Sequence, residues 1–352
     1  MNPDLIADCI IAFYESLPRR GKPQSSEWSV LAGIVAVESD SSMEAVCAAT
    51  GTRCIGKALM RPEGTVLHDS HAETIARRAL IHQTFSELLG ETEPLITRNE
   101  PPTLVFYVSE LPCGDASIVP VDESSMLSLS RADGAATGFT NITGAKPIPE
   151  LPLDLRDDRG VPVHTTGIPR LKSCRSDARP GNISLSLSCS DKLKKWGKLG
   201  FQSALLPHNL EISSLVIGQP GLSEAAQNAV QNSLASFDVY FTSHAFSNCR
   251  SNARTSSAGH GVVATVGGLR EVISGGESLG YKCRLPSQLC KQSLGRMAAR
   301  LLGRSFNYGE EKEKKNVVRT VMSKRKRLVM SGSSDTGVLW CKVDDFVVSN
   351  KD

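Results

Sequence analysis

Two short motifs constrain the fold of this chain more than any other feature of its sequence. They are His71-Ala72-Glu73 and, forty residues later, Pro112-Cys113. Imidazole nitrogen and thiolate sulfur are ligands that zinc prefers, and a carboxylate two residues after the histidine can lie beside a water on the metal without binding the metal itself. If both motifs build one site, a helix that begins near His71 must be followed by a strand that leads into Cys113. The motifs therefore predict a βαβ unit.

The third metal ligand must come from elsewhere in the chain. A catalytic zinc site uses three protein ligands and keeps one position open. The usual second cysteine, three residues after the first, is missing, because residues 112–117 read Pro-Cys-Gly-Asp-Ala-Ser. Cys189, within Ser-Cys-Ser-Asp-Lys at residues 188–192, is the better candidate, and Cys174 is its rival.

The same residues also have ordinary structural explanations. Ser70 and Glu73 fit a capping box at the start of a helix, and Asp69 is a good N-cap. A single cysteine is more often a core thiol than a ligand. The His71 motif alone supports the capping box and the metal site equally, whereas the cysteine motifs in addition favour the metal site.

Composition limits the class of protein. The chain has 352 residues, 40% of them hydrophobic, ten cysteines and a formal net charge of +3. Acidic residues interrupt the apolar N-terminal stretch, so we expect no signal peptide, reduced thiols and an intracellular protein of the cytoplasm, the nucleus or both. No apolar run is long enough to span a bilayer. The small net charge excludes a uniformly basic surface but allows local basic patches.

Hydrophobic periodicity and end signals predict most secondary-structure elements. We expect an N-terminal helix from its apolar positions between residues 5 and 13, and a helix from about residue 71 to residue 89. Residues 121–180 are rich in Ser, Gly, Pro and Asp and predict a long loop region. Further strands are predicted at residues 28–37, 46–54, 104–108, 215–217 and 239–242, and further helices at 225–237, 288–302 and 310–329.

The three motifs, in this order, resemble those of the adenosine deaminases that act on RNA, a family of zinc-dependent nucleobase deaminases. The family has a double-stranded-RNA editing branch and a tRNA branch, and the resemblance runs from about Trp28 to Trp340. It implies an α/β fold with a cytidine-deaminase-like core, a mixed sheet flanked by helices, and a C-terminal helical extension. We expect one domain over residues 1–352 without a separate RNA-binding module, which favours the tRNA branch.

The resemblance also implies roles for residues around the motifs. Zinc would be held by His71, Cys113 and Cys189, with Glu73 as the catalytic proton shuttle. Thr52 matches a residue that lines the adenosine pocket, although an ordinary turn threonine explains it equally well. Asp69 and Lys146 match a polar relay behind the zinc.

A set of basic and aromatic residues matches the family's binding site for a buried inositol hexakisphosphate. Buried cations need an anion, so a compact polyanion would explain why charged residues follow motifs that must be buried. A charge run such as residues 324–327 is more simply a solvated face. The matching residues are Arg77, Arg78, Lys192, Lys195, Trp196, Lys291, Tyr308, Lys312 and Trp340.

The sequence therefore predicts a hydrolase that converts adenosine to inosine in tRNA, at the position just 3′ of the anticodon of alanine tRNA if the resemblance holds in detail. The expected partner is tRNA, with no membrane and no protein partner implied. Two alternatives stay open. A double-stranded-RNA editor should carry an acidic residue in a Gly-rich loop, but residues 165–169 read Thr-Thr-Gly-Ile-Pro. A non-catalytic RNA-binding protein with a structural zinc would have no use for Glu73.

Overall fold

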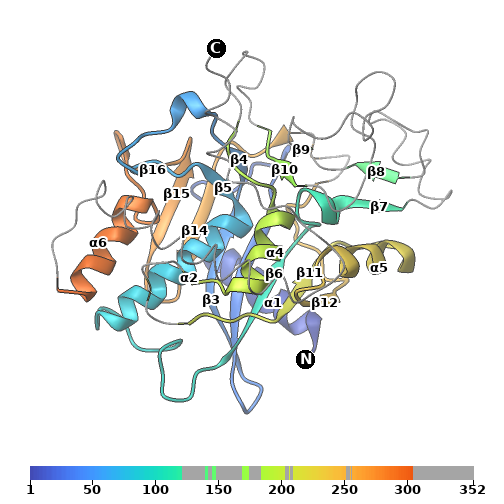
Figure 1. Ribbon diagram of the computed structural model, residues 1–352, viewed down its shortest axis with the longest axis horizontal. Coiled ribbons are helices and arrows are strands. Elements are labelled where there is room, and N and C mark those ends of the chain that lie inside the picture. Colours follow the sequence, from blue (N-terminus) through green and yellow to red (C-terminus); the bar gives the residue numbers. More distant parts are fainter. Residues whose placement is uncertain are drawn as a thin grey trace, which may run out of the picture.

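The computed structural model of the chain is an α/β arrangement in which helices cover both faces of one large mixed sheet (Figure 1). The residues that it describes are 1–120, 139–141, 145–147, 169–173, 184–202, 206, 209–250, 254 and 256–303. The helices in these ranges are α1 (Pro3–Ser16), α2 (Ala72–Leu88), α4 (Cys189–Leu199), α5 (Glu224–Ser233), α6 (Lys291–Leu301) and the short 3-10 helices η1 (Lys57–Leu59) and η2 (Asp115–Ser117).

The central sheet joins a parallel half to an antiparallel half. Strands β6, β11 and β12 run parallel to one another and form the parallel half. Strand β6 pairs antiparallel with β2, and the antiparallel half extends from β2 to β17. In the described part of the chain the sheet has nine strands, in the order β12 (Asp238–Phe241), β11 (Ser214–Ile217), β6 (Thr103–Val108), β2 (Leu31–Val37), β3 (Met43–Thr50), β14 (Gly261–Thr265), β15 (Arg270–Ser274), β16 (Glu277–Leu279) and β17 (Arg284–Leu285).

Strand β2 is buried on both faces, which explains why its sequence is a continuous apolar run. Leu31 and Val35 contribute to a smaller core with Ile6, Ile10 and Tyr14 of α1. Helix α1 therefore covers one face of the sheet, and in Figure 1 it lies behind the strands, near the N-terminus.

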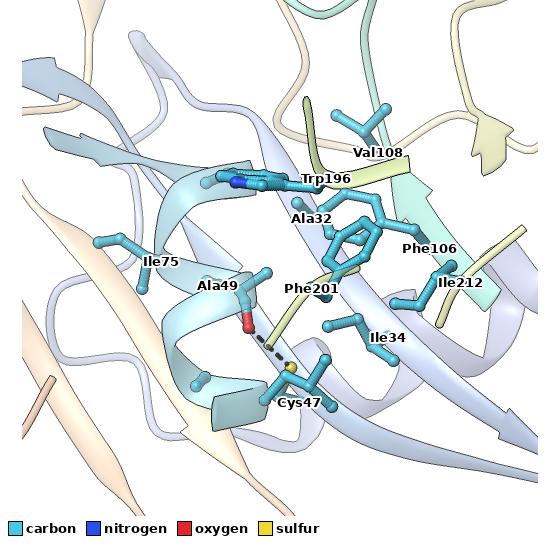
Figure 2. Close-up of a cluster of buried hydrophobic side chains, with 14 of the residues drawn as sticks. Ala32, Ile34, Cys47, Ala49, Ile75, Phe106, Val108, Trp196, Phe201 and Ile212 are labelled. Carbon is cyan, nitrogen blue, oxygen red and sulfur yellow. Dashed lines mark hydrogen bonds between the residues drawn. The ribbon is translucent and has the colours of Figure 1, made fainter. Parts of the chain in front are cut away.

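The opposite face carries the larger core and the helices that hold the candidate site. Ala32 and Ile34 of β2 point to this side, where they pack with residues of α2, α4, α5 and α6. The ring centroids of Phe106 and Trp196 lie 5.6 Å and 5.5 Å from that of Phe201. Figure 2 shows this aromatic group over the strands, and it fixes α4, which begins at Cys189, against the end of β6.

Short strand pairs form the edges of the candidate site. Thr50 at the end of β3 pairs with Leu31, and Val108 at the end of β6 pairs with Ala32, so the segments that follow β3 and β6 emerge at the same end of the sheet. The short pairs are β4 (Thr52–Cys54) with β5 (Asp69–His71), β1 (Glu27–Trp28) with β13 (Ser256–Ser257), β7 (Ile118–Pro120) with β8 (Phe139–Asn141), and β9 (Lys146–Pro147) with β10 (Arg170–Leu171).

The predicted fold class, a mixed sheet flanked by helices, is confirmed. Most predicted elements within the described residues are present with bounds shifted by a few residues, but the antiparallel strands β14 to β17 were not predicted. The predicted helix at residues 310–329 lies outside the described residues, as does most of the predicted loop region at 121–180. None of the described helices combines the length and apolar character needed to cross a bilayer.

Candidate active site

The two cysteine motifs interlock, although 75 residues separate them in the sequence. The Ser190 backbone N–H donates to the Cys113 carbonyl at 3.0 Å, and the Cys189 backbone N–H donates to the Cys113 Sγ at 3.4 Å. Gly114 has a φ of 108°, and a Cβ there would lie 2.2 Å from the Ser188 Oγ. Only glycine permits this backbone conformation and this close approach, so the Pro-Cys-Gly sequence is what brings the two loops together.

His71 joins these cysteines from the other side of the site. It is the last residue of β5 and the residue before α2. Its Nδ1 lies 3.8 Å from the Cys113 Sγ and 3.7 Å from the Cys189 Sγ. Within the described ranges, these residues form the one group of three potential ligands whose ligand atoms all lie within 4.8 Å of one another.

This triangle has the dimensions of a tetrahedral zinc site. Zn–N and Zn–S bonds of about 2.1 and 2.3 Å at tetrahedral angles place nitrogen and sulfur about 3.6 Å apart. The two nitrogen–sulfur distances, 3.8 and 3.7 Å, are close to that value. One imidazole and two thiols also make a donor set that zinc prefers and that leaves a fourth position open. The residues present therefore fit a catalytic zinc ion.

Glu73 lies in the first turn of α2 and is only 2% exposed. Its Oε2 is buried and has no hydrogen-bond partner among the described residues. An unsatisfied buried polar atom costs about 1–3 kcal/mol, so this oxygen is suited to a water or a substrate atom. The capping-box interpretation is wrong, because His71, not Ser70, precedes the helix and no side chain caps it, while Ser70 lies within β5.

Asp69 is the centre of a buried polar network behind His71. Its Oδ2 accepts hydrogen bonds from the Lys172 Nζ at 2.7 Å and from the Ser186 Oγ at 2.9 Å, and it also accepts one from the Lys192 Nζ. Its Oδ1 accepts the His71 backbone N–H at 2.9 Å, which holds the ligand histidine in place. Asp69 therefore orients His71 from within β5 and does not act as a cap of α2.

Lys172 links this network to a thiol of the candidate metal-ligand set. Its Nζ donates to the Cys189 Sγ at 3.0 Å as well as to Asp69, and the residue is only 3% exposed. Burial alone would lower the pKa of Lys172, but Asp69 and the two cysteines outweigh it and raise the pKa well above its ordinary value. Burial would likewise raise the pKa of Asp69, but Lys172 and Lys192 hold it well below the ordinary range. The two groups are therefore a charged pair, and the ammonium opposes the rise in the pKa of the Cys189 thiol that burial and Cys113 cause.

The sequence interpretation of this network was incomplete. Among the described residues, the basic groups on Asp69 are Lys172 and Lys192, and Lys172 was not predicted. The predicted relay residue Lys146 lies in β9 and pairs through its backbone with Leu171, the residue before Lys172, but its side chain lies outside the described residues. No local signal marks Lys172, because it is brought to Cys189 by backbone hydrogen bonds between distant segments, such as that from the Lys172 N–H to the Ser186 carbonyl at 2.8 Å.

Thr52 lies next to the ligand histidine. It pairs with His71 across β4 and β5, and its Oγ1 is buried without a partner among the described residues. Gly51, just before it, accepts the Ala72 backbone N–H at 2.9 Å. The hydroxyl of Thr52 and the carboxylate of Glu73 are thus two unsatisfied polar groups on the segments flanking His71, as a pocket for a polar substrate requires.

The geometry agrees with the family to which the sequence points. The adenosine-deaminase (editase) domain model matches residues 47–326. The chain belongs to the adenosine-deaminase (editase) family. A tRNA-specific adenosine deaminase 1 of Drosophila melanogaster is 35% identical over 210 residues, covering 57% of this chain and 50% of that protein. A tRNA-specific adenosine deaminase 1 of Mus musculus is 30% identical over 342 residues, covering 64% of this chain and 67% of that protein.

The editing branch of the family matches as well. The double-stranded RNA-specific editase Adar of Drosophila melanogaster is 28% identical over 222 residues, covering 56% of this chain and 31% of that protein. This chain therefore spans between about half and two thirds of the length of the two tRNA-specific relatives, and a smaller share of the length of the Adar protein.

Two of the residues predicted for the polyphosphate site, Arg77 and Trp196, contact each other. Arg77, one helical turn after Glu73, is half-buried, donates to the Gln202 carbonyl at 2.7 Å and lies 5.0 Å from the Trp196 ring centroid. Its Nε has no hydrogen-bond partner, and none of the described carboxylates pairs with it. Burial, followed by the charge of Arg78, lowers the pKa of Arg77 to about 9.

His68 is a residue of this region that the sequence did not reveal. It immediately precedes Asp69, and its Nε2 is buried without a partner among the described residues. Burial, followed by the charges of Lys291, Arg78 and Lys192, lowers the pKa of His68 to about 4. Three of the predicted cations, from three separate elements, are therefore close enough to act on one side chain.

The remaining predicted residues differ in what the structure says of them. Lys195 lies in α4, one residue before Trp196. Five predicted residues or ranges lie outside the described residues, namely Cys174, Tyr308, Lys312, residues 324–327 and Trp340.

Proposed function

We propose that this chain is a zinc-dependent enzyme that hydrolyses adenosine to inosine in tRNA. The observation that carries the proposal is the His71–Cys113–Cys189 triangle with the buried Glu73 carboxylate beside it, in a chain of the editase family. When bound to these three residues, zinc would supply a Lewis acid that lowers the pKa of water toward neutrality.

Glu73 would carry the protons of the reaction. Its free oxygen takes a proton from the water that adds to C6 of adenine and delivers a proton to N1 of the ring. The same carboxylate then protonates the departing amine, so that water and adenine become hypoxanthine and ammonia. A buried carboxylate that is free of other hydrogen bonds at Oε2 is suited to this exchange, because no internal partner competes for the proton.

The chain's other site residues position the reacting groups. Asp69 fixes the His71 backbone, and Lys172 stabilises the Cys189 thiolate. The Thr52 hydroxyl, which lacks a hydrogen-bond partner among the described residues, would contact the adenosine. The target base must leave its stack to enter such a site, which costs least in a single-stranded loop.

Transfer RNA is the substrate class that we propose, with the adenosine just 3′ of the anticodon of alanine tRNA as the position. Two relatives bearing the name tRNA-specific adenosine deaminase 1 support this choice. The alternative, editing of double-stranded RNA, draws support from the similarity to Drosophila Adar. Incubation with tRNA transcripts and with a long RNA duplex, followed by sequencing for inosine, separates the two. Inosine in the duplex alone would favour the alternative.

We also propose that inositol hexakisphosphate is a structural cofactor, held by Arg77, Arg78, Lys192, Lys195, Trp196 and Lys291, together with Tyr308, Lys312 and Trp340 from outside the described residues. The half-buried Arg77 supports it, because its Nε is buried without a hydrogen-bond partner among the described residues and a phosphate oxygen could accept from it. So does the convergence of Lys291, Arg78 and Lys192 around His68. Mass spectrometry of small molecules released by denaturation tests this, and active protein free of any polyphosphate would refute it.

A further inference from the structure

Another group of side chains lies between the segments that carry His71 and Cys113. On the His71 side, the Val30 carbonyl accepts the Gly51 N–H at 3.2 Å, and Gly51 in turn accepts the Ala72 N–H at 2.9 Å. On the Cys113 side, the Glu110 Oε1 accepts the Arg250 N–H at 2.8 Å. The segment before Val30 and the segment around residue 250 also contact each other, because the Ser29 N–H donates to the Asn248 carbonyl at 2.9 Å.

These contacts bring Trp28 and Arg250 together beside the metal-ligand set. The Arg250 guanidinium carbon lies 5.5 Å from the centroid of the Trp28 ring. Trp28 is half-buried and Arg250 is exposed, so the pair offers an aromatic ring and a positive charge at the surface. Glu110 fixes Arg250 only through its backbone N–H. It is therefore a positioning residue that ties this pair to the segment leading into Cys113.

Two further guanidinium groups flank the pair. Arg53, next to Thr52, donates to the Ser257 carbonyl at 2.7 Å, and Arg254 donates to the Glu27 carbonyl at 2.9 Å. Of the strands involved, β4 pairs with β5, which ends at His71, and the Arg53 contact links β4 to β13, which pairs with β1. With Glu27 and Glu110 as the acidic residues among these contacts, three arginines leave a net positive charge around Trp28.

A surface cation–aromatic pair alone means little, because such a pair is worth only about 0.5–1 kcal/mol at an exposed site. The chain has a comparable pair, Lys282 over Tyr281 at 6.0 Å, in the turn between β16 and β17 at the far edge of the sheet. What distinguishes Trp28 and Arg250 is their place beside the reacting centre. Single-stranded nucleic acids bind to this chemistry, an aromatic ring that stacks on a base next to arginines that meet phosphates.

We propose that Trp28 and Arg250 form the binding position for the nucleotide adjacent to the reacting adenosine. The inference rests on the proposed action on RNA. When the target adenosine leaves its stack, the neighbouring base loses a stacking partner, and the Trp28 ring replaces it. Arg250 and Arg254 neutralise the adjoining phosphates. This position reads the neighbouring base by its stacking strength, so a purine is preferred to a pyrimidine at that place.

The first experiment measures deamination by Trp28→Ala, Trp28→Phe and Arg250→Ala on tRNA transcripts that differ only at the nucleotides flanking the target. Stacking on an aromatic side chain is worth about 1–3 kcal/mol per base, so Trp28→Ala should lower kcat/KM roughly 5- to 150-fold. Trp28→Phe should keep most of the activity. Arg250→Ala should weaken the salt dependence of binding, with a slope smaller by about one. The control is Tyr281→Ala combined with Lys282→Ala, which should change neither quantity.

A second measurement does not depend on turnover. A tRNA with 2-aminopurine next to the target, bound to a Glu73→Gln chain, should lose fluorescence by stacking, and the loss should disappear when Trp28→Ala is added. If Trp28→Ala lowers the unfolding temperature, a change in the RNA tests the inference instead of a change in the protein. An abasic flanking nucleotide should then lower the activity of the unaltered chain by the same factor.

The outcomes separate this inference from the proposed function. If the unaltered chain forms inosine, but Trp28→Ala acts equally well on every flanking nucleotide, the nucleotide position is wrong and the proposed function stands. If the abasic flank leaves the activity of the unaltered chain unchanged, the inference is also overturned. If the zinc-loaded chain forms no inosine in any RNA, the proposed function is wrong. If the 2-aminopurine fluorescence also stays unchanged on binding, the inference is wrong as well.

Discussion

Asp69, which is buried, and Arg77, which is half-buried, are charges on neighbouring segments, and the structure compensates them in different ways. Asp69 receives hydrogen bonds from Lys172, Lys192, Ser186 and a backbone N–H. Arg77 donates to one carbonyl and packs on Trp196, and no described carboxylate pairs with it. The charge of Asp69 is therefore balanced by neighbouring residues, which we call the balanced region, whereas Arg77 has no such partner among the described carboxylates and is where we propose that an anion binds. The metal-ligand set belongs to the balanced region.

We expect the largest effect, a loss of zinc and of activity, when a proposed zinc ligand near Asp69 is replaced. Cys189→Ala removes one of the three proposed zinc ligands and leaves the Lys172 ammonium without its sulfur partner. We expect zinc content to fall from about one per chain to near zero, with loss of inosine formation. Elemental analysis by mass spectrometry measures the zinc. Cys174→Ala is the control and should keep its zinc; the reverse result would make Cys174 the ligand.

Breaking the Asp69 network should be the next largest effect. Lys172→Met leaves a buried carboxylate with one cation fewer, and breaking a buried pair typically costs about 3–5 kcal/mol of stability. Urea unfolding of the zinc-loaded protein measures the loss. The control is Arg98→Met, which breaks an exposed pair with Glu38 and should change stability by about 1 kcal/mol or less. Equal effects in the two variants would remove the distinction between the balanced region and an ordinary surface pair.

Arg77→Met tests the second region by the sign of its effect. If a polyphosphate compensates Arg77, the variant should hold less polyphosphate and unfold at a lower temperature. If no anion is bound, replacing a half-buried, unpaired cation by an apolar side chain removes a desolvation penalty and raises the unfolding temperature. Thermal unfolding combined with phosphate analysis distinguishes these results, with the exposed Arg300→Met as the control.

We expect a smaller effect on the pH dependence of the free energy of unfolding. Burial and the charges of Lys291, Arg78 and Lys192 lower the pKa of His68 from 6.5 to about 4. Between pH 6.5 and about pH 4 the unfolded chain binds a proton at His68 that the folded chain does not bind. His68 therefore does not reduce the free energy of unfolding above pH 6.5, and it reduces this free energy progressively as the pH falls toward 4. A bound polyanion offsets the cations and reduces the decline.

We therefore expect the decline to be steeper in Arg77→Met, which would hold less polyphosphate, than in the unaltered chain. It should shrink when His68→Asn is added to Arg77→Met. Thermal unfolding at a series of pH values measures it. The same pH dependence in all three proteins would show that His68 does not sense these cations.

Local motifs predicted the site better than they predicted its surroundings. His71, Cys113 and Cys189 carry their own chemistry in the sequence, and the structure brings all three together. The start of α2 was placed too early, because Ser70 and Asp69 are good caps by type, yet pairing of β5 with β4 keeps them extended. Lys172 and the Trp28–Arg250 pair could not be foreseen, since each acquires its neighbours only through contacts between distant segments.

The most direct test of the central claim is inosine formation by the unaltered chain and by Glu73→Gln, each with its zinc content measured. Glutamine keeps the shape of the side chain but cannot shuttle a proton, and positioned acid–base groups contribute about 10²–10⁴-fold in rate. The account predicts inosine in tRNA with the unaltered chain, and a loss of at least that size in Glu73→Gln with one zinc still bound. A Glu73→Gln chain that forms inosine at an undiminished rate would contradict it.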